Sequence, residues 1–230
     1  MKYKNIKEIY INNLYKSEFD DSIKKDLTRT FPDDISFRRG ETNYKKLYNI
    51  LTSYSNYNKS IGYAQGLNFI SANAIYFCNT EDEVFLFLDS MINRFELFNL
   101  MSIDNKNLIP KLNFFSNILS KHVPDIINFF TENQLNHGFF STKWILTLFS
   151  VSMKRKYLMN CWAFMIILGW KFFYSFVVQV LTFYKEDIIE TNVKDLRYKM
   201  QNILQDKKFE KNYYNIIKNT LNFMKKNIVL

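Results

Sequence analysis

Apolar side chains recur at intervals of three and four residues along most of this chain, which is the spacing of amphipathic helices. No stretch alternates convincingly between apolar and polar residues as a half-buried strand does, and no segment is repeated. The periodicity predicts helices over residues 1–19, 23–30, 44–57, 67–77, 81–92, 108–121, 124–134, 139–151, 157–184 and 209–224. We therefore expect an all-α fold.

Two short signals refine the ends of these helices. Thr80 and Glu83, three residues apart, are the pair expected of a capping box at the start of the helix over 81–92. Pro32 is expected to stop the helix over 23–30, because proline has no backbone N–H and restricts the residue before it.

The most apolar stretch covers residues 161–184 and is long enough to span a bilayer. Lys171 lies near its middle, where a charged side chain would cost about 2.5–3.5 kcal/mol in lipid, and Gln179 is also polar. Gly169 is expected to divide the stretch into two helices. Two packed core helices therefore fit better than a membrane span, and we predict no transmembrane segment.

Composition agrees with a folded helical protein. The 230 residues are enough for one core or for one domain with two lobes, and 47% of them are hydrophobic. Only five Gly and three Pro are present, which favours long helices over a sandwich or a barrel.

The net charge of +9 is spread along the chain. Pairs of lysines occur at 24–25, 45–46, 207–208 and 225–226. Because they form no single dense block, a solvated basic surface fits better than a nucleic-acid footprint, and we predict no nucleic-acid partner. An acidic protein partner, or peripheral contact with an anionic membrane, stays open.

Cysteine and histidine usage excludes several chemistries. Cys78 and Cys161 are the only cysteines and lie in apolar surroundings, which fits a reduced intracellular protein better than a disulfide framework. His122 and His137 are too isolated to form a metal site or a Cys/His nucleophile pair. The charged N-terminus lacks the apolar core of a signal peptide, so we expect a cytoplasmic protein.

Polar side chains stand out at two places in the first third of the chain. Asp26 and Arg29 are three residues apart and therefore share one face of a helix, either as a weak ion pair or as an arginine held and aimed outward. Gln65 lies between Gly62 and Gly66, where a loop is expected to turn into a helix. Its amide could cap that helix, lie on the surface, or offer a donor and an acceptor to a partner.

These residues carry a resemblance to the TBC domain, the catalytic module of Rab-type GTPase-activating proteins. The first motif is I-x-x-D-x-x-R, formed by Ile23, Asp26 and Arg29 and followed by T-F-P. The second is Y-x-Q, formed by Tyr63 and Gln65 within G-Y-A-Q-G-L-N. The first two motifs together are specific, whereas either alone would be weak.

A third block lies later in the chain. It comprises K-W-I-L-T-L-F-S at residues 143–150, followed by Trp162 and Gly169. The family usually has an acid after the tryptophan and another before the glycine, where this chain has Ala163 and Leu168. We also find no counterpart of the family's early Arg-Gly…Trp element upstream of residue 20. These departures bear on helix packing and partner affinity more than on the chemistry.

The resemblance implies a TBC-type multi-helix domain in two helical lobes. It places an N-terminal helix at residues 1–19 and the domain at residues 20–230, with the motifs within 20–185 and C-terminal helices at 186–230. The implied function is activation of a Rab-family small GTPase in vesicle traffic, with no enzymatic turnover of the chain's own. The alternative is a catalytically weak or inactive TBC module that binds GTP-loaded Rab as an effector or scaffold.

The resemblance also assigns roles to the motif residues. Arg29 would be an arginine finger and Gln65 a glutamine finger, both supplied in trans, while Asp26 and Tyr63 would support them and contact the partner. No cofactor of the chain's own is implied, because magnesium and GTP would belong to the GTPase. Localisation would be cytoplasmic, with peripheral association with endomembranes left open.

Overall fold

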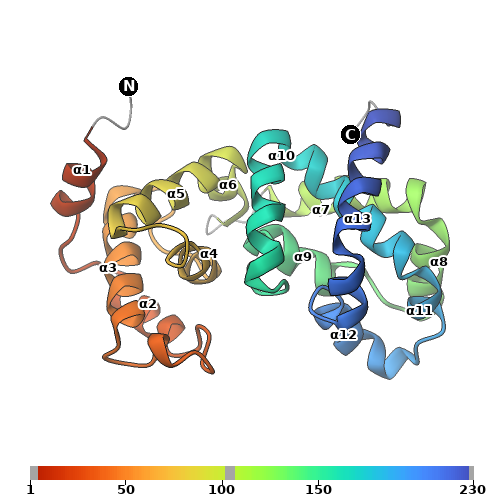
Figure 1. Ribbon diagram of the computed structural model, residues 1–230, viewed down its shortest axis with the longest axis horizontal. Helices are drawn as coiled ribbons and strands as arrows, with labels where there is room; N and C mark the ends of the chain where they lie inside the picture. The colour runs from red at the N-terminus through yellow and green to blue at the C-terminus, as the bar shows by residue number, and fades with distance from the viewer. Residues whose placement is uncertain (1–4, 102–106, 228–230) are drawn as a thin grey trace. The chain divides into compact units, whose positions relative to one another are not determined.

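The computed structural model describes residues 5–101 and 107–227, and within these ranges every regular element is a helix (Figure 1). The chain divides into two compact units, Met1–Lys106 and Asn107–Leu230. We call them the N-terminal unit and the C-terminal unit and describe each by itself. The expected all-α fold in two helical lobes is confirmed.

Helix α3 is the centre of the N-terminal unit. This helix, Thr42–Tyr57, packs against α1 (Ile6–Asn12), α2 (Asp20–Leu27), the 3₁₀ helix η1 (Ile35–Phe37), α4 (Leu67–Ala74) and α5 (Glu81–Arg94). A last helix, α6, covers Leu97–Met101 and contacts α5. Because α3 has neighbours on several faces, it buries apolar side chains and also polar ones. The buried polar residues include Ser53, Ser55 and Asn56.

Those buried polar groups of α3 are hydrogen-bonded to the chain that precedes α2. The Ser53 hydroxyl donates to the backbone oxygen of Tyr10 at 2.8 Å. The Asn56 amide donates to the backbone oxygens of Asn13, at 2.9 Å, and Tyr15, at 2.6 Å. These bonds hold α1 and the segment after it against the core, since a buried donor without a partner would be costly.

The observed helices differ from the predicted ones in their extent and in their number. The helix expected over residues 1–19 is shorter, because α1 ends at Asn12 and turns follow it. Helix α2 ends at Leu27, so Arg29 lies in the turn beyond it. The short helices α6 and α11 have too few turns to show a periodicity. Periodicity did not predict α12 either, although it lies within the C-terminal helices expected at 186–230. The capping box of Thr80 and Glu83 is confirmed.

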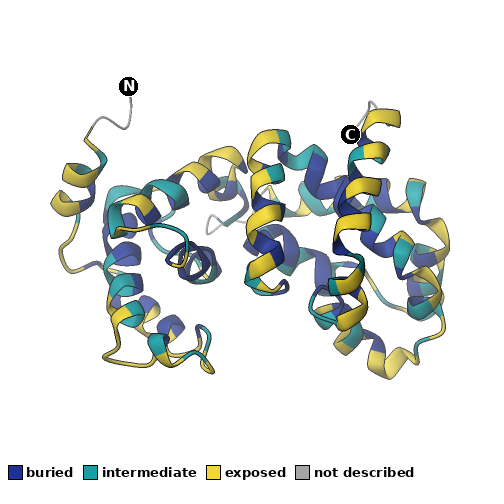
Figure 2. Cartoon of the chain, viewed as in Figure 1, coloured by how far each residue is buried: buried dark blue, intermediate teal, exposed yellow. Residues whose placement is uncertain are grey.

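The C-terminal unit is built on the longest helix, α10, Arg155–Phe183, with α13, Lys207–Lys226, packed along it. The other helices are α7 (Leu108–His122), α8 (Pro124–Glu132), α9 (Gly138–Thr147), α11 (Lys185–Ile189) and α12 (Val193–Asn202). Helix α13 is strongly amphipathic, with Phe209, Tyr213 and Ile216 buried and its lysines exposed (Figure 2).

Gly169 divides α10, as predicted. Its backbone angles, φ 65° and ψ −152°, are not helical and lie in a region that favours glycine, so two helical stretches meet there at a kink. By length and composition α10 could cross a membrane, but 61% of its most apolar window is buried inside the protein. The core helix of a soluble protein can be equally long and apolar, and such a helix is mostly buried, as α10 is.

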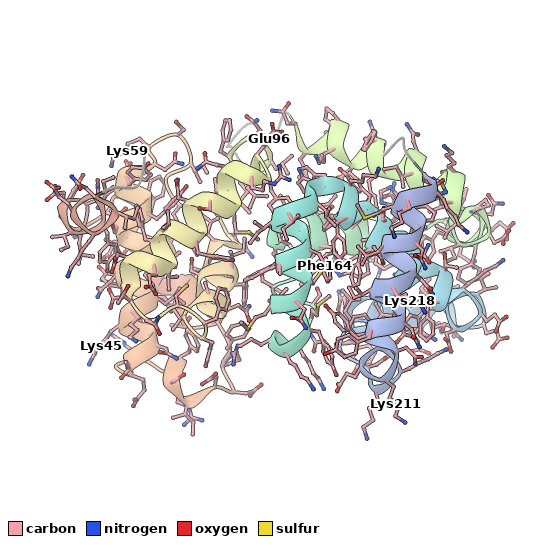
Figure 3. The ribbon with its side chains drawn as sticks, turned by 45° about the horizontal axis from the view of Figure 1, so that its top comes forward. Lys45, Lys59, Glu96, Phe164, Lys211 and Lys218 are labelled. Carbon is pink, nitrogen blue, oxygen red and sulfur yellow. The ribbon has the colours of Figure 1, made fainter. Side chains whose placement is uncertain are left out.

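The basic residues are dispersed over both units. Lys45 and Lys59 are exposed in the N-terminal unit, and Lys211 and Lys218 are exposed along α13 (Figure 3). This pattern agrees with the expectation of a solvated basic surface.

Candidate functional site

Arg29 lies in a tight turn directly after α2. The backbone N–H groups of Arg29 and Thr30 donate to the carbonyl oxygens of Asp26 and Leu27, each at 3.2 Å, and so tighten the end of the helix. The Arg29 guanidinium donates through Nη2 to Oδ1 of Asp26. The Asp26 side chain is 5% exposed, whereas that of Arg29 is 47% exposed. The arginine is therefore anchored at one edge while much of its surface faces solvent.

The second carboxylate oxygen of Asp26 is also occupied. The Tyr63 hydroxyl donates to Oδ2 of Asp26 at 2.7 Å, so Tyr63 is joined to Arg29 through one buried carboxylate. Burial, together with the hydrogen bond to Asp26, raises the pKa of Tyr63. The phenol therefore keeps its proton and acts as a donor, and the first two sequence motifs meet at Asp26.

Gln65 lies in the loop between α3 and α4, and two glycines shape that loop. Gly62 has φ +59°, and a Cβ atom there would lie 2.2 Å from the ring of Phe19. Gly66 has φ +113° and is the N-cap of α4. The Gln65 side chain is exposed and forms no hydrogen bond with any other residue that the structure describes. A capping role for Gln65 is therefore wrong, and its amide is free for an outside partner.

Two buried polar residues join the two motif stretches: Thr30, the first residue of T-F-P, and Asn68, the last residue of G-Y-A-Q-G-L-N. Neither was predicted to have a role in the site. The Asn68 amide donates through Nδ2 to the Thr30 hydroxyl at 2.8 Å, and its Oδ1 accepts from the backbone N–H of Gly66 at 3.1 Å. Thr30 in turn donates to the backbone oxygen of Asp26 at 2.7 Å. The signal available in the sequence was an asparagine within an otherwise apolar helical run, Leu67 to Ile70.

An open basic cleft of about 620 Å³ lies beside the first motif. Its walls come from α2, α3 and the segment between them: Lys24, Lys25, Thr28, Arg39, Tyr44 and Tyr48. Asp20 accepts from Lys24 and from the Tyr48 hydroxyl, each at 2.7 Å, and these hydrogen bonds lower the pKa of Asp20. Lys25 and Arg39 form no ion pair with any carboxylate of residues 5–101 or 107–227. The cleft therefore carries uncompensated positive charge.

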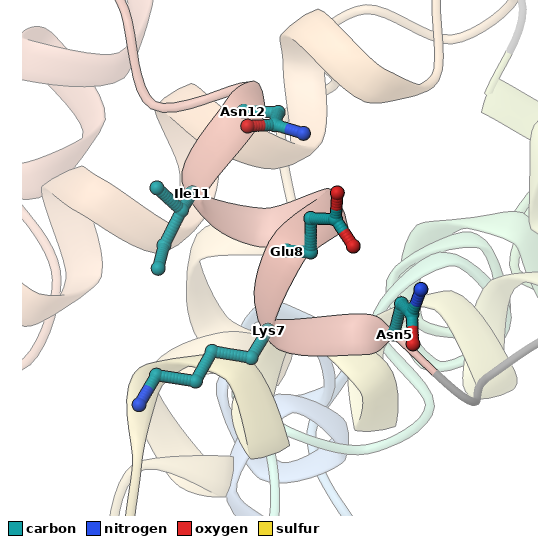
Figure 4. A pocket seen from close by; sticks show the side chains of 5 residues that line it. All are labelled: Asn5, Lys7, Glu8, Ile11 and Asn12. Atoms are coloured by element: carbon teal, nitrogen blue, oxygen red, sulfur yellow. The ribbon is translucent and has the colours of Figure 1, made fainter.

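A second hollow, of about 440 Å³, lies along α1 and contains no motif residue. Figure 4 shows the side chains that line it: Asn5, Lys7, Glu8, Ile11 and Asn12. In the part of the chain that the structure describes, no group of three or more His, Cys, Asp or Glu side chains could hold a metal ion.

The third sequence block belongs to the core of the C-terminal unit. Trp144 and Trp162 are each 1% exposed, and the Trp162 indole donates to the backbone oxygen of Leu148 at 2.8 Å. Leu148 has φ 48°, so this bond stabilises a backbone conformation that is unusual for leucine. Of the two positions that depart from the family pattern, Ala163 is exposed and Leu168 is half-buried.

Comparison with known proteins supports the resemblance. A family model described as Rab-GTPase-TBC domain matches residues 1–189. Growth hormone-regulated TBC protein 1 of Xenopus laevis is 26% identical over 186 residues, which cover 80% of this chain and 54% of that protein. The GTPase-activating protein GYP5 of Saccharomyces cerevisiae is 25% identical over 193 residues, 84% of this chain and 20% of that protein.

Solved structures show the same fold. The Ypt/Rab-GAP domain of Gyp1p superposes with a TM-score of 0.79 at 13% identity, over 97% of this chain and 80% of that one. The Chlamydomonas flagellar RabGAP TBC domain superposes with a TM-score of 0.74 at 19% identity, over 95% and 71%.

The chain spans only part of its full-length relatives, 54% of the Xenopus protein and 20% of GYP5. The family match nevertheless covers most of the chain, from residue 1 to residue 189, and the two solved TBC domains share its fold. The chain belongs to the Rab-GTPase-TBC domain family.

Proposed function

We propose that this chain activates a Rab-family small GTPase by supplying Arg29 and Gln65 to its active site. The observation that carries the proposal is the arrangement around Asp26. One buried carboxylate anchors the half-exposed Arg29 on one side and Tyr63 on the other, and Tyr63 is two residues from an exposed and unpaired Gln65. The charged guanidinium of Arg29 and the neutral amide of Gln65 are thus both exposed to solvent, and the Asp26–Tyr63 hydrogen bond joins their motifs.

The chemistry explains why these two residue types suit the task. GTP hydrolysis transfers the γ-phosphoryl group to water, yielding GDP and phosphate, and negative charge spreads over the phosphoryl oxygens in the transition state. Arginine is permanently charged, and its planar group can donate to several oxygens at once. Glutamine can accept a hydrogen bond from the attacking water and donate one to the γ-phosphate. Positioning and electrostatic stabilisation then supply most of the acceleration.

Asp26 and Tyr63 have supporting roles in this proposal. Asp26 occupies only one edge of the guanidinium, so the remaining N–H groups of Arg29 stay available for phosphate oxygens. Tyr63 holds Asp26 in place through its hydroxyl and shapes the surface next to Gln65. Fixing the arginine before the partner arrives reduces the conformational entropy that binding would otherwise cost.

The basic cleft would extend the docking surface. Lys25 and Arg29 are four residues apart around the end of α2, and Lys25 and Arg39 have no ion-pair partner among the described residues. An acidic segment of the GTPase beside its nucleotide would therefore bind there, and the attraction would weaken with salt. Exchange of Lys25 for Glu should raise the KM for the GTPase and leave kcat much less affected.

Magnesium and GTP would enter the complex with the GTPase, so the chain would contribute side chains alone. The activity would serve vesicle traffic in the cytoplasm, with peripheral contact at endomembranes through the dispersed lysines. The net charge of +9 is the observation behind the proposed contact with an anionic membrane surface.

Multiple-turnover GTP hydrolysis by a panel of Rab GTPases, with and without the chain, tests the proposal. At least one Rab should be stimulated, and Arg29→Ala should reduce the stimulation by about 10³–10⁵-fold. Gln65→Ala should reduce it by about 10²–10³-fold, as loss of one positioned hydrogen-bonding group does.

Two exposed side chains provide matched controls. Arg38→Ala removes an exposed arginine outside both motifs, and Gln201→Ala removes an exposed glutamine of α12. Both variants should retain the full stimulation. Activity that survives Arg29→Ala and Gln65→Ala would contradict the assignment of the two residues.

The second candidate function is a binding module without catalysis. It is favoured by Ala163 and Leu168, which replace the two acids of the family's third block. Binding of GTP-loaded Rab with no rise in hydrolysis would favour this function. Stimulation that depends on Arg29 would exclude it.

A further inference from the structure

The two finger motifs are joined by a second bridge that does not pass through Asp26's carboxylate. Asn68, in the first turn of α4, is fully buried and donates to the hydroxyl of Thr30 at 2.8 Å. Its Oδ1 accepts from the backbone N–H of Gly66 at 3.1 Å. Thr30 immediately follows Arg29 in the chain, and Gly66 immediately follows Gln65. One asparagine side chain therefore contacts the chain neighbours of both finger residues.

Thr30 completes the bridge on the other side. Thr30 is 1% exposed, and its hydroxyl donates to the backbone oxygen of Asp26 at 2.7 Å and accepts from Asn68. The bridge thus runs from the Asp26 carbonyl through Thr30 and Asn68 to the Gly66 amide. Within the bridge, the Thr30 hydroxyl hydrogen and one Asn68 amide hydrogen each have an acceptor. Buried polar groups are normally paired in this way.

The residue types fit this position narrowly. Asn68 must donate at one end and accept at the other, which an aspartate cannot do when it is ionised and a leucine cannot do at all. Gly66 has φ +113°, and its N–H lies at the start of α4, where a buried donor would otherwise have no partner. The bridge therefore determines where the backbone of residues 65 and 66 lies relative to the turn that carries Arg29.

We propose that Thr30 and Asn68 are positioning residues that hold the Arg29 turn and the Gln65 loop at the spacing needed to act on one phosphoryl group. This inference rests on the proposed function. A displacement of about 1 Å in a positioned group can cost on the order of 10²-fold in rate. Neither residue touches the reacting atoms, so both act only through the backbone of their neighbours.

A purely structural role is the competing explanation, because the rings of Phe31 and Phe69 also pack together, with centroids 5.9 Å apart. That apolar contact joins the same two segments without directing hydrogen bonds. Variants that remove the bridge while keeping side-chain volume separate the two explanations. Thr30→Val is nearly isosteric and removes the hydroxyl, Thr30→Ser retains it, and Asn68→Asp keeps the acceptor but loses the amide donor.

A matched control exists in the C-terminal unit. Thr220 is fully buried, and its hydroxyl donates to the backbone oxygen of Ile216 at 2.8 Å, which is the same local bond that Thr30 makes to Asp26. Thr220 bridges no motif. Thr220→Val therefore reproduces the loss of a buried hydroxyl without the loss of the bridge.

The first measurement does not depend on GTPase activity. Amide hydrogen exchange at Gly66, followed by NMR on the intact chain, should accelerate by at least about tenfold in Thr30→Val and Asn68→Asp, because the segment opens more readily. Thr30→Ser and Thr220→Val should leave it near the wild-type rate. Unchanged exchange at Gly66 in both bridge variants would overturn the bridge itself.

The second measurement uses the GTPase identified in the panel. Thr30→Val should lower kcat by about 10–10²-fold with a much smaller change in KM, and Thr30→Ser should restore most of it. In a Gln65→Ala background the effect of Thr30→Val should shrink to a few-fold, because the group that it positions is gone. Effects that multiply independently in the double variant would overturn the positioning role. If no Rab responds to the wild-type chain, the proposed function and the positioning role both fail, while the exchange data still decide the bridge.

Discussion

The sequence motifs of the two units lie in different kinds of interior, one hydrogen-bonded and the other aromatic. In the N-terminal unit, Asp26, Thr30 and Asn68 are buried polar residues whose hydrogen bonds join the first two sequence motifs. In the C-terminal unit the third sequence block is surrounded by rings. Trp144 packs on Phe140 with centroids 4.9 Å apart, and Phe149 stacks on Phe173 at 4.7 Å.

These two interiors have different physical consequences. Aromatic packing contributes free energy through buried area and volume, and it tolerates small adjustments of each ring. A hydrogen-bonded network contributes less net free energy but fixes direction, because an unsatisfied member is costly. If the N-terminal unit aims Arg29 and Gln65 at a GTPase, as proposed, a hydrogen-bonded network suits that task, whereas aromatic packing suits a scaffold.

The largest expected effect on stability lies in the aromatic interior. Trp144→Ala should lower the free energy of unfolding by about 3–5 kcal/mol, since it leaves a cavity among Phe140 and Phe149. Trp144→Phe should cost less because much of the volume is kept. Urea denaturation followed by circular dichroism measures both. A cost for Trp144→Ala no greater than that of removing one hydroxyl from the polar network would break the comparison between the units.

A smaller effect is expected when one member of the polar network is removed. Tyr63→Phe deletes the donor to Oδ2 of the buried Asp26 and should cost about 1.5–3 kcal/mol, the range for hydrogen bonds to charged groups. Tyr44→Phe is the matched control, since the half-buried Tyr44 hydroxyl bonds to no other described residue. Urea denaturation compares the two variants, and equal costs would mean that the Asp26 network contributes nothing beyond ring burial.

The loop that carries Gln65 gives an effect of similar or smaller size. Gly62→Ala places a methyl group against the ring of Phe19 at a positive φ and should cost about 1–3 kcal/mol. The double variant with Phe19→Ala removes the clash but keeps the backbone strain, so thermal melts of the cycle should recover part of the loss. Additive losses in the double variant would contradict the close approach of Gly62 and Phe19.

The smallest expected effect is a pH dependence in the C-terminal unit. His137 is buried beside Phe115 and contacts the Ser141 hydroxyl through Nδ1 at 2.9 Å, and burial lowers its pKa. In the unfolded chain His137 has its ordinary pKa of about 6.5. Below that pH the unfolded chain therefore binds more protons at His137 than the folded chain does. Stability is therefore unaffected above that pH and falls as pH drops below it, towards the folded pKa.

His137→Gln should remove this part of the pH dependence in denaturation curves taken between about pH 7.5 and pH 5. Burial and Lys121 lower the pKa of His122 as well, so a residual dependence of the same sign should remain. It should disappear when His122 is also replaced by Gln. An unchanged pH profile in His137→Gln would show that the burial of His137 has no energetic consequence.

The sequence predicted the long elements because their periodicity depends only on local spacing. The helices α3, α7 and α8, the capping box of Thr80 and the break at Gly169 follow from residues close to one another in the chain. The end of α2 did not follow, because the hydrogen bonds that turn the chain at Arg29 and Thr30 compete with one more helical turn. The extent of α1 was also overestimated, since bonds from Ser53 and Asn56 of α3 hold the segment instead.

The same division applies to the candidate site. The sequence alone predicted the fold class and singled out Asp26, Arg29, Tyr63 and Gln65 as candidate site residues, because helical periodicity and short motifs are local properties of the chain. Only the tertiary structure decided that one carboxylate joins Arg29 to Tyr63, that Gln65 has no described partner, and that Asn68 bridges both motifs. The Tyr63–Asp26 and Asn68–Thr30 hydrogen bonds join residues 37 and 38 positions apart in the chain. Such long-range bonds form only when packing brings their donors and acceptors together.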